Sequence, residues 1–212
     1  MNRGVVIVGA GGHAKVCIEL LRASGTPIAC CIAGEDSGPD CIGVPVLKGD
    51  EHLLRMRESG CDLAFIALGS NALRQRLGHS VLQMGYQLVN AISPQATISP
   101  TARLGRGIAV MAGAVINACT SIGDLAIINT LASVDHDGNI GEAVHIAPHC
   151  GLAGVVTVAE RAFLGVGCKV IPEISIGADA VVGAGSVVVS NIAPRTKVAG
   201  VPARPLNKTK AL

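Results

Sequence analysis

The sequence predicts two folds in one chain: a small Rossmann-like α/β domain over residues 1–92 and a parallel β-helix over residues 93–212. From residue 98 to residue 188 an aliphatic residue recurs at every sixth position, a period that fits neither a helix nor a flat strand. Before residue 92, strand patterns instead alternate with helical ones. One Tyr, two Phe and no Trp make a core of small aliphatics, which suits thin coils.

The N-terminal region is predicted to form a parallel sheet covered by helices. The glycine-rich turn at 9–12 opens the first helix, and Gly25 is expected to end it after Ser24, because helix C-termini favour glycine. Residues 34–43 are expected to form a loop, and Ser93-Pro94 and Ser99-Pro100 mark the change of fold. Strands are expected at residues 4–9, 28–32, 63–68 and 87–91, and helices at 13–24, 50–58 and 71–84.

The six-residue repeat predicts a triangular solenoid. If three repeats close one coil, residue i lies beneath residue i+18, about 4.8 Å away along the axis. We expect the glycines that follow the aliphatics, such as Gly105 and Gly123, to form corners with positive φ. Gly141, Gly165, Gly177 and Gly183 share this position. The aliphatic positions are Ile98, Leu104, Val110, Ile116, Ile122, Ile128, Val134, Ile140, Ile146, Leu152, Val158, Leu164, Val170, Ile176, Val182 and Val188.

Charge and cysteine usage predict a cytoplasmic protein without nucleic-acid or membrane partners. The net charge is only +2, and no apolar run is long enough for a transmembrane helix. Residues 1–4 lead into a strand without the architecture of a signal peptide. The eight cysteines form no CxxC pair, so we expect reduced, mostly buried thiols. Residues 207–212 are expected to form a polar tail.

The turn Gly9-Ala-Gly-Gly-His13 is a candidate anion site. Its backbone N–H groups, including those of Gly11 and Gly12, lie at a helix N-terminus, which favours phosphate. A dinucleotide fingerprint is an alternative, although Ala14 replaces the third glycine and the acidic Glu35 and Asp36 lie beyond the expected spacing. A purely structural strand–helix turn is a further alternative. His13 exceeds the generic motif and could donate to a phosphate or a sugar.

The densest polar cluster of the solenoid is Asp135-His136-Asp137-Gly138. The small residues Ala118 and Gly154 lie one coil below and one coil above His136, so its ring should stand beside a gap. A neighbouring carboxylate can orient an imidazole and raise its basicity, as a general base requires. The alternative is a solvated turn, because these residue types are common in turns.

A zinc site formed by His136, His145 and His149 is a third interpretation. Solenoid carbonic anhydrases bind metal with three histidines between subunits. Their final histidine pair, however, has a spacing one residue wider, and they carry no separate N-terminal α/β unit. The sequence therefore disfavours zinc.

Over nearly its whole length the chain resembles the hexapeptide-repeat acyltransferases of the sialic-acid O-acetyltransferase type. Within them it is most similar to the nucleotide-amino-sugar N-acetyltransferases of bacillosamine and perosamine synthesis. The repeats alone indicate only the superfamily, whereas their combination with the Gly-Gly-His turn is more specific. The matching stretches are residues 9–13, 67–71, 89–90, 98–102, 128–130, 134–145, 150–154 and 200–203.

The resemblance implies a left-handed β-helix that forms a homotrimer, with active sites between neighbouring subunits. It implies that His136 is the base and that Asp137 raises its basicity. The sugar nucleotide would contact Gly11, Gly12, His13 and Gly69, and Asn129 would lie beside the sugar. Glu35 and Asp36 stand near the place of an Asp-Asp pair that binds the nucleotide base in relatives. Acetyl-CoA would contact His145, Gly154, Val166 and Ala184.

The function implied is transfer of acetyl from acetyl-CoA to the amino group of a UDP-, GDP- or dTDP-linked amino-deoxysugar, with no metal and no covalent enzyme intermediate. A backbone N–H near Gly154 would stabilise the developing oxyanion. O-acetylation of sialic acid or a serine-like hydroxyl is the enzymatic alternative, because a histidine base serves amines and alcohols alike. A non-catalytic sugar-nucleotide sensor is an alternative from another class, and it leaves His136 unexplained.

Overall fold

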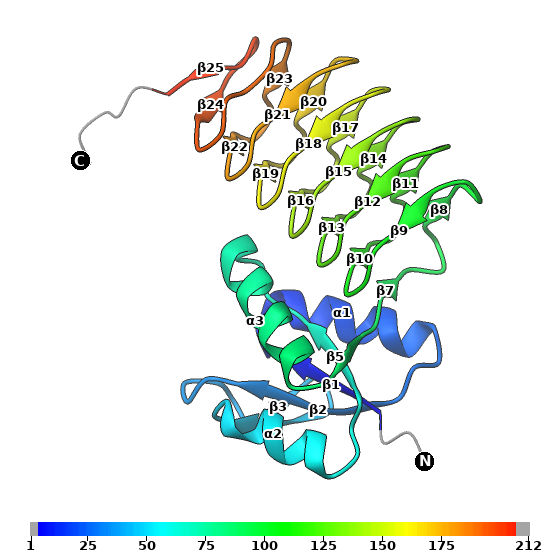
Figure 1. The fold of residues 1–212 in the computed structure, drawn as a ribbon, viewed down its shortest axis with the longest axis vertical. Helices are drawn as coiled ribbons and strands as arrows, with labels where there is room; N and C mark the ends of the chain where they lie inside the picture. The colour runs from blue at the N-terminus through cyan, green and yellow to red at the C-terminus, as the bar shows by residue number, and fades with distance from the viewer. Residues whose placement is uncertain (1–3, 207–212) are drawn as a thin grey trace. The chain divides into compact units, whose positions relative to one another are not determined.

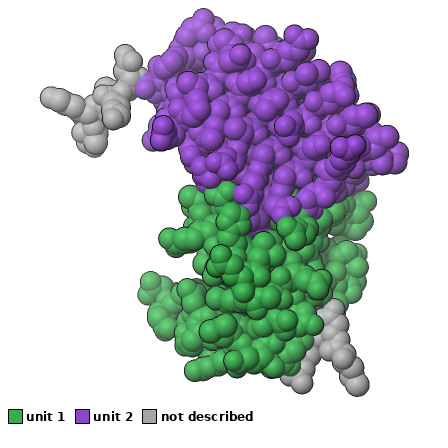
Figure 2. Space-filling view, viewed as in Figure 1, with its two compact units in different colours: residues 1–94, 106–109 green, residues 95–105, 110–212 purple. Residues whose placement is uncertain are grey.

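The computed structural model describes residues 4–206, which fall into two compact units (Figure 2). Unit 1 comprises residues 1–94 with 106–109, and unit 2 comprises residues 95–105 with 110–212. The expected tail at 207–212 and the first three residues lie outside the described residues. No helix within residues 4–206 combines the length and the apolar character needed to cross a bilayer.

Unit 1 is a six-stranded sheet in the order β3-β4-β2-β1-β5-β6, with three helices (Figure 1). All four residues of the central strand β1 are buried, as expected for a parallel strand inside an α/β domain. Gly25 ends α1 with a φ of 71°, as predicted. The elements are β1 Val5–Val8, α1 Gly12–Ala23, β2 Ile28–Ala33, β3 Asp40–Cys41, β4 Val44–Lys48, α2 Glu51–Glu58, β5 Leu63–Ile66, α3 Asn71–Gln83, β6 Gln87–Leu88 and β7 Ala91–Ile92.

The prediction of a loop over residues 34–43 was partly wrong. Strand β3 lies within it, pairs antiparallel with β4, and joins β4 through Ile42 and Gly43. Both joining residues have positive φ, 47° and 79°, which is the geometry of a tight hairpin turn. The Gly43 N–H also donates to Asp40 Oδ1 at 2.9 Å. An Ile at the first turn position hid this hairpin from pattern reasoning, because bulky residues rarely adopt positive φ.

Unit 2 is the predicted left-handed parallel β-helix, with a two-residue strand at every sixth position (Figure 1). Residues eighteen apart pair in register, for example Ile116 with Val134 and Ile128 with Ile146, so three repeats make one coil as expected. The strands are β8 Thr97–Ile98, β9 Arg103–Leu104, β10 Ala109–Val110, β11 Val115–Ile116, β12 Ser121–Ile122, β13 Ile127–Ile128, β14 Ser133–Val134, β15 Asn139–Ile140, β16 His145–Ile146, β17 Gly151–Leu152, β18 Thr157–Val158, β19 Phe163–Leu164, β20 Lys169–Val170, β21 Ser175–Ile176, β22 Val181–Val182, β23 Val187–Val188, β24 Lys197–Ala199 and β25 Arg204–Pro205.

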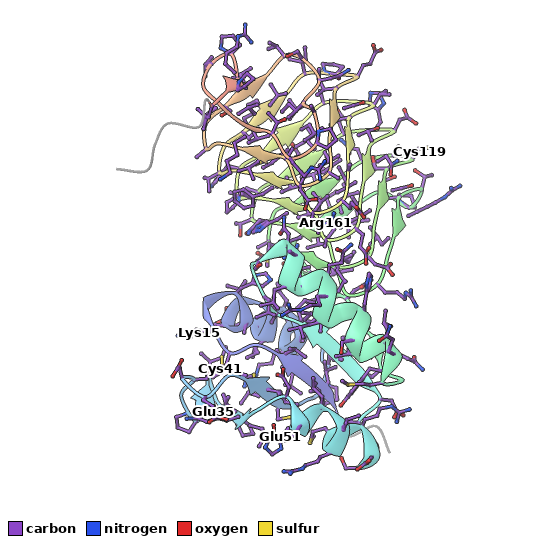
Figure 3. The ribbon with its side chains drawn as sticks, turned by 60° about the vertical axis from the view of Figure 1, so that its left-hand side comes forward. Lys15, Glu35, Cys41, Glu51, Cys119 and Arg161 are labelled. Carbon is purple, nitrogen blue, oxygen red and sulfur yellow. The ribbon has the colours of Figure 1, made fainter. Side chains whose placement is uncertain are left out.

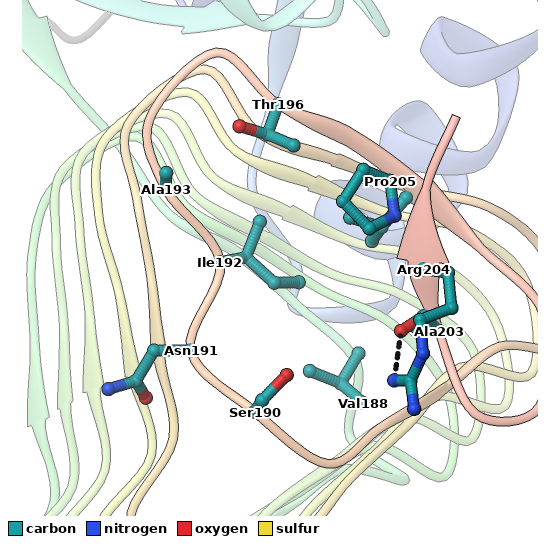
Figure 4. Close-up of a pocket in the computed structure, with 10 residues that line it drawn as sticks. Val188, Ser190, Asn191, Ile192, Ala193, Thr196, Ala203, Arg204 and Pro205 are labelled. Atoms are coloured by element: carbon teal, nitrogen blue, oxygen red, sulfur yellow. Dashed lines mark hydrogen bonds between the residues drawn. The ribbon is translucent and has the colours of Figure 1, made fainter. Parts of the chain in front are cut away.

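Three parallel sheets form the faces of the solenoid. Sheet I contains β25-β24-β22-β19-β16-β13-β10, sheet II contains β23-β20-β17-β14-β11-β8, and sheet III contains β21-β18-β15-β12-β9. The turns between consecutive strands stack into three edges, which we call I–II, II–III and III–I after the sheets they join. At the C-terminal end, β25 folds back antiparallel on β24 beside a cavity of about 280 Å³ (Figure 4).

The prediction that Gly105, Gly123 and their equivalents adopt positive φ at the corners was wrong. Positive φ occurs two residues later, mostly at residues that are not glycine, such as Cys119, Leu125 and Asp137. The glycines are required instead by close packing between coils. A Cβ at Gly123 would lie 2.8 Å from the backbone nitrogen of Glu142 in the next coil, closer than van der Waals contact permits.

Candidate active site

The Asp135–Gly138 turn lies on edge II–III and presents His136 and Asp137 to solvent. The His136 Nδ1 atom lies 2.8 Å from Asp137 Oδ2, and both side chains are more than half exposed. The hydrogen bond that His136 donates to Asp137, together with the negative charge of Asp135, raises the pKa of His136 above its usual value. Asp137 itself adopts positive φ, 55°, like the equivalent residue of other turns. The ring therefore keeps Nε2 available for proton transfer.

The residues stacked on His136 lie in the predicted register. The Asp137 N–H donates to the carbonyl of Ala118 at 2.9 Å, and the Val155 N–H donates to the carbonyl of His136 at 2.9 Å. We predicted that the His136 ring stands beside an empty gap, but the ring fills the space left by the missing side chain of Gly154. A Cβ on Gly154 would lie 2.6 Å from His136 Nε2. Only glycine at 154 leaves room for this imidazole. Gly154 is buried, and its N–H has no hydrogen-bond acceptor within residues 4–206.

Two side chains from the coil below also hold the turn, and the sequence reasoning missed both. Asn117 Nδ2 donates to Asp135 Oδ1 at 2.9 Å, and the same oxygen accepts the His136 N–H at 2.8 Å. These two bonds, first the one from the His136 backbone, lower the pKa of Asp135. Thr120 Oγ1 donates to the Asp135 carbonyl at 2.7 Å and accepts the Gly138 N–H at 3.1 Å. The eighteen-residue spacing was the signal that could have found Asn117.

Asn129 and His145, assigned above to different ligands, contact each other. Asn129 Nδ2 lies 3.1 Å from His145 Nε2, and the His145 ring packs edge-on against Phe163 with centroids 5.2 Å apart. The Asn129 amide thus approaches the imidazole from edge I–II, where Val166 and Ala184 also lie. The remaining predicted acetyl-CoA contact, Gly154, lies on edge II–III.

Within one chain the histidines of the zinc interpretation are not brought together. His136 is on edge II–III, His149 is on edge I–II, and His145 begins a strand of sheet I. Among residues 4–206 no three His, Cys, Asp or Glu side chains are grouped so that they could hold a metal ion.

Unit 1 contains a separate cavity of about 380 Å³ at the carboxyl ends of β1, β2 and β5. Ligands of open α/β sheets bind at this end of the strands. Gly11 lines the cavity, whereas a Cβ at Gly11, Gly12 or Gly69 would meet nothing within 4 Å. The fold itself therefore does not require glycine at these three positions, whereas a ligand lying close to the backbone would require it. The lining residues are Val8, Gly9, Ala10, Gly11, Ile32, Ala33, Gly34, Ser37, Asp50, Leu68, Leu73, Arg76 and Leu77.

Next to this glycine turn, His13 is half-buried and its Nε2 lies 3.5 Å from Cys17 Sγ. Burial, and then repulsion from the Arg74 guanidinium, lower the pKa of His13 to about 4. Arg74 is the largest fully buried side chain and donates to the carbonyls of Leu68 and Gly69 at 2.9 and 3.3 Å. Sequence reasoning missed Arg74, because an arginine on an amphipathic helix is normally placed on its solvent side.

Glu35, labelled in Figure 3, and Asp36 lie in an exposed turn after β2. Neither lines the cavity. The polar groups that do line it are Ser37, Asp50 and Arg76.

Several known proteins are similar to this chain. Residues 4–81 match the family described as PglD N-terminal domain. PerB from Caulobacter crescentus, solved in complex with CoA and GDP-perosamine, is 53% identical over 96% of this chain and 97% of that chain, with a TM-score of 0.94. The acetyltransferase domain of PglB from Neisseria gonorrhoeae, solved in complex with acetyl coenzyme A, is 35% identical over 97% of this chain and 100% of that chain, with a TM-score of 0.90.

Among curated proteins, the serine acetyltransferase of Escherichia coli K12 is 31% identical over 150 residues, which cover 66% of this chain and 51% of that protein. The chain spans about half the length of the curated relatives that it matches first.

Proposed function

The chain belongs to the hexapeptide-repeat acyltransferases that include the nucleotide-amino-sugar N-acetyltransferases, and on that premise we propose that it acetylates the amino group of a nucleotide-linked amino-deoxysugar with acetyl-CoA. The observation that carries this proposal is the hydrogen-bonded pair of His136 and Asp137, whose imidazole packs against Gly154. PerB, which is similar over nearly the whole chain, binds CoA and GDP-perosamine.

His136 is proposed as the general base. Because Nδ1 is hydrogen-bonded to Asp137, the Nε2 atom is the one that takes the proton from the acceptor amine. The amine nitrogen attacks the thioester carbonyl carbon as it loses this proton. The carbon–sulfur bond of the tetrahedral intermediate then breaks, and the imidazolium returns the proton to the leaving CoA thiolate. Asp137 stabilises the imidazolium between these two steps, which fits the raised pKa of His136.

The Gly154 N–H is proposed as the oxyanion donor. It is the amide of the residue against which the His136 ring packs, and no residue of the described chain accepts from it. A pre-positioned amide of this kind stabilises the charge that develops on the thioester oxygen, and removing one such donor typically costs about 10²–10³ in kcat.

The proposed acetyl-CoA contacts argue for a homotrimer. His136 and Gly154 lie on edge II–III, whereas Asn129, Val166 and Ala184 lie on edge I–II of the same chain. Sheet II separates these two edges, so one site can contain both groups only if a second copy supplies one of them. Exposed apolar side chains on both edges, including Val155 and Val166, suit such an interface. We expect a mass of three times 21.4 kDa in solution.

The sugar nucleotide is proposed to bind unit 1 through Gly11, Gly12, His13 and Gly69. The two helix N-termini of α1 and α3, at Gly12 and Asn71, favour phosphate. Neutral His13 can donate one hydrogen bond without adding a charge. Contacts of Glu35 and Asp36 with the base stay a prediction. A cytoplasmic location is also part of the proposal, supported by eight unpaired cysteines.

The test is acetyl-CoA turnover with a panel of acceptors, followed through the thiol released. We expect turnover with one or more UDP-, GDP- or dTDP-linked amino sugars and none with their hydroxyl analogues. Faster turnover of serine or sialic acid would instead establish O-acetylation. Tight binding of a sugar nucleotide with no turnover of any acceptor would establish a sensor and overturn the proposal. Mass photometry on the same sample tests the trimer, and a monomer at all concentrations would contradict the shared site.

A further inference from the structure

One buried hydroxyl breaks the apolar pattern of the solenoid beneath the His136 turn. Four residues after each inner aliphatic, the repeat carries a side chain that is almost always small or apolar. Thr120 and Ser186 are the two hydroxyl side chains at this position that are 0% exposed. The equivalent positions hold Ala102, Ile108, Ala114, Ala126, Ala132, Gly138, Val144, Cys150, Val156, Ala162, Cys168, Ile174 and Ala180.

The Thr120 hydroxyl is inserted into the turn that carries His136. In several other turns of the solenoid, though not in those at residues 153–156 and 171–174, the N–H of the fourth residue donates directly to the carbonyl of the first. Examples are Ala114 to Met111 at 3.2 Å and Cys168 to Gly165 at 3.1 Å. In the Asp135–Gly138 turn, Thr120 Oγ1 instead donates to the carbonyl of Asp135 and accepts the N–H of Gly138.

This insertion ties together the two ends of the turn, between which His136 and Asp137 lie. The hydroxyl makes one hydrogen bond to the first residue and one to the fourth. Gly138 must be glycine to allow it, because a Cβ there would lie 3.3 Å from Thr120 Cγ2 and 2.9 Å from Val134 Cγ1. Since the His136 ring packs against Gly154 without spare room, a turn of different width would move Nε2.

We propose that Thr120 is a positioning residue: its buried hydroxyl sets the width of the Asp135–Gly138 turn and thereby the place of the His136 imidazole. This role rests on the proposed function, in which His136 takes the proton of the acceptor amine. Thr120 touches no substrate, so its loss should affect the chemical step and not the binding of either substrate. A displacement of about 1 Å at a reacting group can cost on the order of 10²-fold in rate.

The test replaces Thr120 by Val, which has the same shape and lacks the hydroxyl. Val is compatible with packing at this position, because Val144 and Val156 occupy equivalent sites and are fully buried. We expect Thr120→Val to lower kcat about tenfold or more, with KM for both substrates within about threefold of wild type. Thr120→Ser restores the hydroxyl and should recover most of the kcat.

Ser186→Ala is the matched control. Ser186 is equally buried at the same repeat position, and its Oγ accepts the Gly200 N–H at 3.2 Å, far along the solenoid from His136. It should lose thermal stability as Thr120→Val does, yet keep its kcat. If Thr120→Val does not fold, Thr120→Cys takes its place, because Cys150 and Cys168 occupy equivalent positions.

The proposal is overturned if Thr120→Val keeps kcat within twofold, if Ser186→Ala loses as much kcat, or if Thr120→Ser does not recover it. Failure of the proposed function is separable from these outcomes. If the wild-type protein acetylates no amino sugar, the ring Cε1–H resonance of His136 still reports the position of the imidazole by NMR. An unchanged resonance in Thr120→Val would then overturn the positioning role by itself.

Discussion

Unit 1 contains His13 and unit 2 contains His136, two histidines for which we propose roles, and their surroundings are opposite. His13 is half-buried near the Arg74 guanidinium; burial, and then repulsion from that guanidinium, lower its pKa to about 4. His136 is exposed and hydrogen-bonded to Asp137, which raises its pKa. The first imidazole is neutral at every physiological pH, whereas the second gains a proton readily.

This difference assigns the two histidines to different tasks. A group that stays neutral keeps the same protonation state, so it can donate a hydrogen bond to a highly charged substrate at any working pH. A group whose pKa is raised by a neighbouring carboxylate accepts a proton more readily, as a general base must. The residue type alone does not distinguish these roles. What distinguishes them is burial near the Arg74 cation in one case and exposure beside the Asp137 carboxylate in the other.

The largest effect expected from this comparison is that of His136→Ala. Loss of a general base should lower kcat by about 10²–10⁴-fold, while KM for either substrate stays within a few-fold. His13→Ala is the matched change in unit 1, and it should raise KM for the sugar nucleotide while leaving kcat near wild type. Initial rates with each substrate varied in turn separate the two patterns. Wild-type turnover by His136→Ala at neutral pH would place the chemistry elsewhere.

An intermediate effect is expected for the acid stability of unit 1. The pKa of His13 is lower in the folded chain than in the unfolded chain, about 4 against 6.5, so the unfolded state binds the extra proton first. Its contribution is therefore fully present above pH 6.5 and is lost as the pH falls towards 4. By pH 5 the loss is on the order of 2 kcal/mol.

His13→Gln removes this titration, so its free energy of unfolding should fall less between pH 7.5 and pH 5 than that of the wild type. Urea titrations at the two pH values measure the difference. Equal losses in the two proteins would contradict a buried, neutral His13.

The smallest effect expected is that of Asp137→Asn. Asparagine tolerates the positive φ of this position and can still accept from Nδ1, so the change removes the charge and keeps the turn. Without the carboxylate the pKa of His136 should fall, so the acid limb of kcat/KM should move to lower pH. The plateau rate should drop only several-fold. A limb that stays in place in a pH–rate profile would mean that Asp137 does not tune the base.

The sequence predicted the architecture because the aliphatic repeat is local and has no exceptions between residues 98 and 188. It also placed Ala118 and Gly154 in register with His136, since that follows from counting eighteen residues. It could not predict that the ring fills the space over Gly154, because the rotamer depends on the carboxylate of Asp137.

Features that depend on packing between distant residues were the ones that pattern reasoning missed. Arg74 can be buried because the carbonyls of Leu68 and Gly69 accept hydrogen bonds from its guanidinium. The periodicity of the helix sequence does not show that these acceptors lie nearby. The assignment of positive φ to glycines failed for a related reason. Residue 123 must be glycine because the next coil leaves no room for a Cβ, and not because its φ is positive. The positive φ occurs at Leu125, within the turn.

Because residues eighteen apart pair with each other, the effect of an insertion or duplication on the solenoid depends on its length. A duplicated block of eighteen residues adds one whole coil and returns every later side chain to its own edge, so the chain can lengthen without relocating its chemistry. A block of six keeps the aliphatic repeat intact, yet it carries every later turn around the axis to the next edge. If placed between residues 122 and 134, such an insertion would leave a well-packed solenoid in which the Asp135–Gly138 turn no longer lies one coil from Asn117 and Thr120, which hold it. The unit of evolutionary growth for this fold is therefore the coil and not the repeat.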